Sequence, residues 1–149
     1  MIMNKFLLVT LIYLGTTSAF ASDCSINYVA DDQLTNIIKK NGFQFENYQK
    51  LCQTLNKNNA GIKFSSISQI SPYQTTSSVR ASFYLKPTKY KGITSLAKNR
   101  IGYEEKRTTN AEIENTYNVT MELLADLAND DDYRNKMLKE LNEMKDATK

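Results

Sequence analysis

The 149-residue chain contains no histidine, and this absence excludes several kinds of catalytic and metal site. Serine–histidine and cysteine–histidine nucleophilic sites are excluded, together with most zinc sites. The glycine-rich motifs that bind nucleotide phosphates, the G-x-S-x-G motif of serine hydrolases and the D-x-D-x-D-G calcium loop are absent as well. The sequence therefore predicts a protein that is not an enzyme and holds no cofactor or metal.

Long apolar runs are also scarce, and the one that stands out lies at the N-terminus. Lys5 precedes an apolar run from Phe6 to Leu14, and Ala19-Phe20-Ala21 forms an A-x-A cleavage site. This order is typical of a secretory signal peptide, and the run is shorter than the roughly 20 residues that a membrane span needs. We expect a signal peptide over residues 1–21, cleavage near Ala21, and a single domain of residues 22–149 without a transmembrane segment. Its location would be the periplasm or the cell exterior, and the Lys- and Asn-rich composition with one cysteine pair favours the periplasm.

Cysteine occurs twice, at Cys24 and Cys52. Asp23 stands directly before Cys24, where a lipoprotein signal needs a small residue, so a lipid anchor is not expected. Catalysis by Cys24 would need a base, and the chain has no histidine to supply one. Export places both thiols in an oxidising compartment, and the sequence therefore predicts a Cys24–Cys52 disulfide.

The periodicity of the remaining chain indicates an α+β fold. One stretch, residues 78–86, alternates cleanly, with Val79, Ala81, Phe83 and Leu85 on one face, as in a half-buried antiparallel strand. Further strands are expected over residues 62–65 and 100–107, and loops over 71–77 and 88–99. Helices are expected at residues 31–42 and 44–57, from a capping box at 109–112 to residue 128, and after the break at 129–133. The prediction is a small antiparallel sheet of two to three strands, covered on one face by about four helices, with one disulfide.

Charge is unevenly distributed along the chain. Residues 33–107 carry thirteen basic and three acidic residues, whereas residues 108–149 carry five basic and ten acidic residues. The basic part either offers a positive surface to an anionic partner, or folds against the acidic part so that the two charges largely cancel. The sequence leaves both interpretations open.

The densest basic stretch lies between residues 80 and 107, where tyrosines are interspersed with the basic side chains. Basic and aromatic groups together suit an anionic glycan, a polyanion or an acidic protein patch, although edge strands also carry lysine simply to avoid aggregation. The residues predicted to bind a partner are Arg80, Tyr84, Lys86, Lys89, Tyr90, Lys91, Lys98, Arg100 and Arg107.

These observations favour a small exported, non-catalytic protein that binds and covers another protein of the cell envelope, as an inhibitor or an immunity-type protein does. The alternative is a module that binds an anionic glycan, lipid or polyanion through the basic stretch. A second alternative is a histidine-free hydrolase that uses carboxylates. Glu104 and Glu105 are adjacent, however, and would face opposite ways on a strand.

Overall fold

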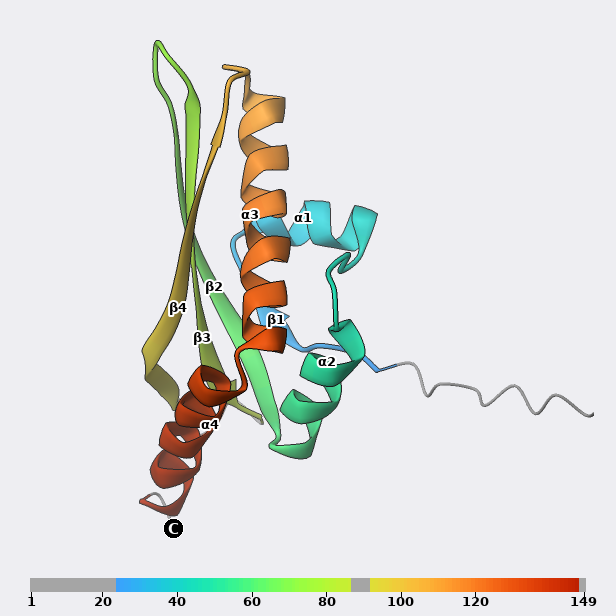
Figure 1. Cartoon of the computed structure of the whole chain (residues 1–149), viewed down its shortest axis with the longest axis vertical. Helices are drawn as coiled ribbons and strands as arrows, with labels where there is room; N and C mark the ends of the chain where they lie inside the picture. Colours follow the sequence, from blue (N-terminus) through green and yellow to red (C-terminus); the bar gives the residue numbers. More distant parts are fainter. Residues whose placement is uncertain (1–23, 87–91, 148–149) are drawn as a thin grey trace, which may run out of the picture.

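The computed structural model describes residues 24–86 and 92–147, which form four helices and a four-stranded mixed sheet (Figure 1). The α+β class is confirmed, but four strands replace the expected two to three. The expected signal peptide lies outside the described residues, and none of the helices described is long and apolar enough to cross a membrane. The elements in chain order are β1 (Tyr28–Val29), α1 (Asp32–Asn41), α2 (Tyr48–Lys57), β2 (Ala60–Ile70), β3 (Thr75–Leu85), β4 (Ile93–Glu104), α3 (Thr109–Asn129) and α4 (Asp131–Asp146).

The sheet has the strand order β1-β2-β3-β4. Strands β2, β3 and β4 form an antiparallel meander of long strands, and the two-residue β1 pairs in parallel with β2. Strand β3 pairs with β2 on one side and with β4 on the other, and its alternating apolar residues point into the core. Val79, Ala81 and Phe83 are fully buried, as the sequence pattern predicted.

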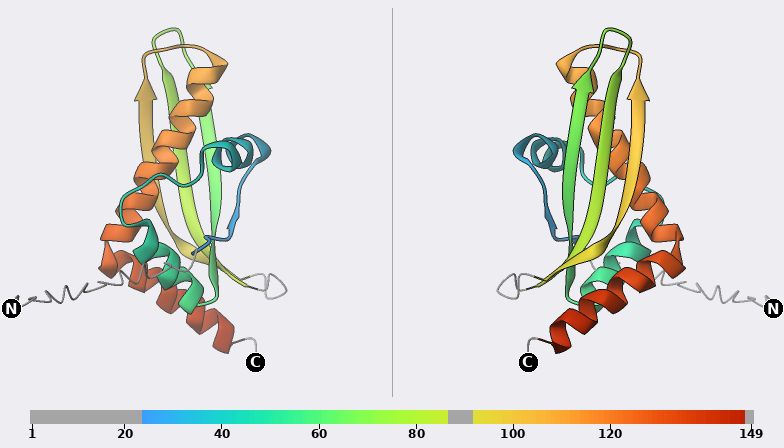
Figure 2. Two further views of the ribbon diagram at one scale, coloured as in Figure 1. Left: turned by 90° about the vertical axis from the view of Figure 1, so that its right-hand side faces the viewer. Right: turned by 90° about the vertical axis from the view of Figure 1, so that its left-hand side faces the viewer.

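The helices cover one face of this sheet (Figure 2). The long helix α3 crosses the inner face, α1 and α2 lie on the same side, and α4 lies across the end where β3 finishes and β4 begins. Leu123, Leu124 and Leu127 of α3 are fully buried against the sheet side chains. The core therefore lies between one sheet face and α3, as expected for an antiparallel sheet covered on one side.

Helix α3 lies close to the sheet where β4 carries a glycine. A Cβ atom added to Gly102 would lie 2.2 Å from Val119 Cγ2. Beside this contact, the Asn115 side chain donates to the Gly102 carbonyl at 3.2 Å and to Ser77 Oγ at 3.0 Å. Glycine is needed here because the helix lies too near the strand for any side chain.

A buried arginine holds the corner between α3 and α4. Arg134 Nη1 donates to the carbonyls of Leu127 and Ala128 at 2.8 Å each, and Nη2 contacts Asp131 Oδ1 at 2.6 Å. These carbonyls end α3 and have no partner within that helix. A positive charge at the C-terminal end also complements the helix dipole, which explains how a guanidinium with 4% exposure is tolerated.

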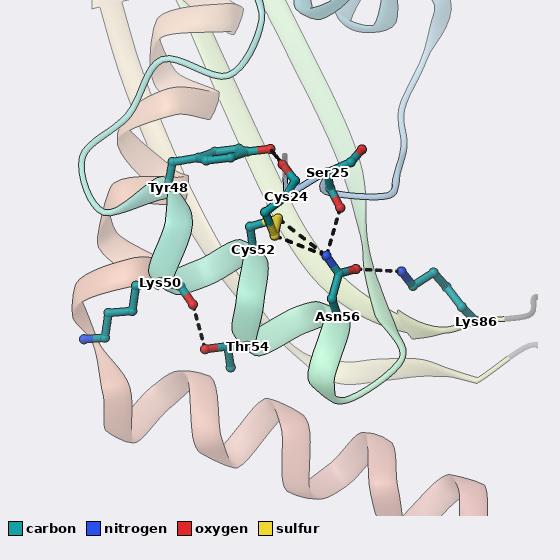
Figure 3. The surroundings of a disulfide bond; sticks show 8 residues. All are labelled: Cys24, Ser25, Tyr48, Lys50, Cys52, Thr54, Asn56 and Lys86. Carbon is teal, nitrogen blue, oxygen red and sulfur yellow. Dashed lines mark hydrogen bonds between the residues drawn. A yellow bond between two sulfur atoms is a disulfide. The ribbon is translucent and has the colours of Figure 1, made fainter. Parts of the chain in front are cut away.

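The Cys24–Cys52 disulfide is present and ties the start of the described chain to α2 (Figure 3). Tyr48 Oη donates to the Cys24 carbonyl at 2.6 Å, and Asn56 Nδ2 donates to the Ser25 carbonyl at 3.2 Å. Cys52 is fully buried, so the bond lies at the edge of the hydrophobic core. It positions the segment that leads into β1.

Several expected boundaries were wrong for identifiable reasons. Helix α2 begins at Tyr48 rather than residue 44, because Asn47 takes the left-handed conformation with φ of 61°. Thr108, not Thr109, caps α3 by accepting the Ala111 N–H at 3.2 Å. Strand β3 begins at Thr75, inside the expected loop 71–77.

The largest error concerns β4, whose first half was expected to be a loop. Its strand character is hidden because Lys98, Arg100 and Gly102 occupy the positions that face the helices. With polar or small residues on the inner face, the period-two pattern that identifies a half-buried strand does not appear.

Removal of the disulfide is expected to lower the free energy of unfolding by about 3.5 kcal/mol, because the unfolded chain regains the freedom of a closed loop with a sequence separation of 28. The measurement is urea unfolding of the oxidised protein and of a Cys24→Ser/Cys52→Ala variant. The variant should be insensitive to reductant. Equal unfolding midpoints for the two proteins would contradict this role.

Replacement of Gly102 by alanine is expected to destabilise the fold by about 1–3 kcal/mol, because Val119 is branched and cannot move aside. Gly92→Ala is the matched control, since its added Cβ would lie no closer than 3.5 Å to a neighbour. A Gly102→Ala/Val119→Ala double variant should lose less stability than the two single changes combined. Additive losses would show that the two residues do not clash.

Candidate binding surface

The sheet face opposite the helices is left uncovered by them and is the candidate binding surface of the described residues (Figure 2). Strand register assigns its side chains, because alternate residues point to opposite faces and the intervening ones are buried under the helices. We call this surface the open face. It comprises Gly61, Lys63, Ser65, Ile67 and Gln69 of β2, Thr76, Ser78, Arg80, Ser82 and Tyr84 of β3, and Ile93, Ala97, Asn99, Ile101 and Tyr103 of β4.

Large apolar side chains are exposed on the half of the open face nearest the β2–β3 turn. Ile67 and Ile101 flank Ser78 in one cross-strand row, with 78% and 56% exposure. The next row holds Tyr103 at 65% exposure, and Tyr73 in the turn is 89% exposed. A cluster of exposed isoleucine and tyrosine side chains on a sheet face is typical of a surface that meets another molecule.

The other half of the open face carries two basic residues, and a tyrosine lies at its far end. Arg80 is exposed and donates through Nη2 to the Ser95 carbonyl at 3.2 Å. Lys63 lies one row further along, opposite Ser82. Tyr84 lies over Gly61, where an added Cβ would lie 2.3 Å from its ring, and burial raises the pKa of Tyr84. None of the residues assigned to this face is acidic.

Two of the residues predicted to bind a partner lie on the helix side of the sheet instead. Arg100 contacts Glu122 at 2.7 Å and Asp126 at 2.6 Å, both on α3. Lys98 contacts Asp130 at 2.9 Å and lies over the Tyr133 ring. In this part of the molecule the basic middle of the chain and its acidic end fold against each other.

The remaining predicted residues are spread around the molecule. Lys86 donates to Asn56 Oδ1 at 3.1 Å, beside the disulfide (Figure 3). Arg107 donates to the Pro72 carbonyl in the β2–β3 turn. Lys89, Tyr90 and Lys91 lie outside the described residues. Of the predicted set, the structure therefore brings Arg80 and Tyr84 together on the open face.

Side chains of α4 occupy the outer edge of β4 near its start. Glu140 accepts the Ser95 N–H at 2.6 Å and the Leu96 N–H at 3.0 Å, and Tyr133 Oη donates to the Ala97 carbonyl at 2.8 Å. Partial burial alone would raise the pKa of Glu140, but the Ser95 side chain and these two N–H groups together lower it. Occupied edge groups are unavailable for pairing with another strand, so this stretch of the edge is protected from strand addition.

Concave features elsewhere offer little for chemistry. A depression of about 430 Å³ lies between α1 and α3, lined by residues that include Lys40, Asn110 and Glu114. Within residues 24–86 and 92–147, no three histidine, cysteine, aspartate or glutamate side chains gather where they could hold a metal ion. Among the described surfaces, the open face therefore remains the candidate functional site.

Sequence reasoning did not identify the apolar residues of this surface. Ile67 interrupts the alternation of β2, and this interruption was the available signal, because an apolar residue out of phase with a buried pattern must face the opposite side. Ile101 and Tyr103 lie in the part of β4 that was expected to be a strand, but nothing in the local pattern indicated which face of that strand is exposed.

The chain matches no protein-family model, and no curated protein and no solved structure matches it either.

The ion pairs at the α3–α4 corner predict a loss of stability at low pH. The Lys98 ammonium, and then the Tyr133 N–H, lower the pKa of Asp130 from 3.8, while Lys50 and Arg134 do the same for Asp131. A carboxyl whose pKa is lower in the folded state stabilises the fold above its unfolded pKa and ceases to do so as pH falls through the folded pKa. The melting temperature should therefore decrease as the pH is lowered below about 4.

Asp130→Asn tests this contribution, because asparagine can still cap α4 but cannot carry the charge. The variant should melt below wild type at pH 6, and the difference should shrink between pH 4 and pH 2. Asp132→Asn is the control, since that carboxylate belongs to no ion pair in the described residues. A difference that stays constant with pH would contradict the ionic origin.

Proposed function

We propose that the protein is a non-catalytic binding protein of an exported compartment, which docks on another protein through the open face. The observation that carries the proposal is the row in which Ile67 and Ile101 stand exposed on either side of Ser78. Isoleucine on a sheet face is normally buried under a second layer, and the helices of this chain occupy the other side. A partner protein would supply the missing layer.

The composition of the open face supports a protein partner. Tyrosine and arginine are enriched at the centres of protein interfaces, and Tyr103 and Arg80 are exposed on this face, with Tyr73 exposed in the adjacent turn. Near the β2–β3 turn the central strand carries Thr76 and Ser78, so the larger side chains on either side are accessible to a partner. An interface of this kind gains affinity from a few large side chains that become fully desolvated.

The charges weigh against an anionic polymer as the partner. Lys98 and Arg100, which the sequence placed in the basic stretch, are already neutralised by Asp130, Glu122 and Asp126. A polyanion site needs several unpaired cations along one surface, since its affinity comes from counterion release. The rows of the open face hold Lys63 and Arg80, and the same face exposes apolar groups that a polyanion would not cover.

Affinity capture tests the proposal with the oxidised protein, produced by export from its full-length chain. Wild type and Ile101→Asp are immobilised and exposed to envelope and secreted extracts at 50 mM and 500 mM salt, and the retained proteins are identified by mass spectrometry. One protein should be retained by wild type at both salt concentrations. Ile101→Asp should reduce its retention by about tenfold or more, because the substitution places an unpaired charge in the apolar row.

Gln53→Asp is the matched control, since it adds the same charge to an exposed position of α2 on the helix side. Retention should survive this change. A partner lost with Gln53→Asp but kept with Ile101→Asp would place the interface on the helices. Glycan or lipid retained at 50 mM salt alone would support the polyanion alternative instead.

A further inference from the structure

We infer that the partner protein docks on the open face through an amphipathic α-helix. This helix carries an acidic residue one turn from its apolar stripe. This inference rests on the proposed function and adds the chemistry of the partner. It draws on the backbone geometry of the sheet, the sizes of the side chains along β3, and the charges of the open face.

The open face presents no free backbone hydrogen-bonding groups along its central strand. The N–H and C=O groups of β3 are paired with β2 and β4 over the length of the meander, so the face offers a docked chain no backbone partners. An extended peptide laid on this face would leave its own backbone groups unpaired where it excludes water, which is costly. A helix satisfies these groups internally and can press its side chains onto the sheet.

Side-chain size varies across the open face near the β2–β3 turn. Along the central strand, Thr76 and Ser78 are small, whereas Ile67 on one side and Ile101 and Tyr103 on the other are large. An apolar side chain of a docked helix can therefore reach the small residues of β3 and contact the large side chains on either side.

The charged residues of the open face favour a partner that carries a carboxylate. Lys63 and Arg80 lie on the open face, and neither forms an ion pair in the part of the chain that the structure describes. The rows of this face contain no carboxylate. A second copy docked face to face would bring the same cations together, so charge disfavours self-association through this surface. A partner with a carboxylate is favoured.

The spacing of the rows specifies where that carboxylate lies. The Arg80 row is adjacent to the row of Ile67 and Ile101, which places the two rows about 7 Å apart along the strands. Residues i and i+4 of a helix are separated by about 6 Å along the axis. A helix whose apolar residue inserts between Ile67 and Ile101 therefore carries its carboxylate over Arg80 when the acid is three or four positions away.

A random library of 16-residue peptides displayed on phage tests the inference. Phage are selected on the oxidised full-length-derived protein and depleted on Ile101→Asp, so that binders of the open face remain. Selected peptides should carry aspartate or glutamate three or four positions from a large apolar residue. As synthetic peptides they should gain helical circular dichroism on binding.

Affinities of the selected peptides are then compared across variants. Arg80→Gln should weaken binding tenfold or more, because it removes a charge-assisted hydrogen bond. Lys40→Gln is the matched control, since it removes an exposed positive charge from α1 on the helix side, and it should leave affinity unchanged. Thermal unfolding of each variant establishes that the fold is intact.

The possible failures separate the inference from the proposed function. Peptides that lose binding with Ile101→Asp, but are neutral, basic or non-helical or bind Arg80→Gln equally well, would overturn the inference and leave docking on the open face intact. The same holds if no peptide is enriched while a protein is captured in an Ile101-dependent manner. Phosphatidylglycerol vesicles that bind wild type and not Ile101→Asp, with no peptide enriched, would overturn both.

Discussion

The packing of α3 against the inner face of the sheet is the contact on which the rest of the structure depends. The helix contributes fully buried leucines to the core, and it lies against β4 closely enough that Gly102 cannot carry a side chain. The other helices pack around α3 and complete the core, with Leu34 of α1, Leu51 of α2 and Met137 of α4 buried in it. The opposite side of the sheet is left without a covering layer, and that consequence defines the candidate site.

The same contact sorts the charges of the chain. Carboxylates of α3 and of the α3–α4 corner face the inner side of β4, where Arg100 and Lys98 meet them. Neutralisation is therefore concentrated on the helix side, while Lys63 and Arg80 on the open face have no carboxylate beside them. The net charge of the chain is small, but the two sides of the molecule differ. On the helix side the charged residues form ion pairs with one another, whereas the open face is positively charged and suits an acidic partner.

Local signals in the sequence predicted part of this arrangement. The alternation of β3 placed Arg80 and Tyr84 opposite the core, and the break at residues 129–133 located the junction of α3 and α4. Strand β4 was largely missed because its inward positions are occupied by charged and small residues, whose partners lie on α3 and α4. The side on which Lys98 and Arg100 lie depends on register across β3, and no local pattern contains that information.

The sequence by itself determined that no histidine-dependent site can form, which two cysteines pair, and which residues of β3 share a face. Composition and period-two alternation are properties that the sequence contains directly. The tertiary structure decided which basic residues are neutralised and which remain on a surface, since these outcomes follow from contacts between distant segments. It also decided that Ile67, Ile101 and Tyr103 share one exposed face. That grouping arises only when three strands align in register and the helices all pack against the other side.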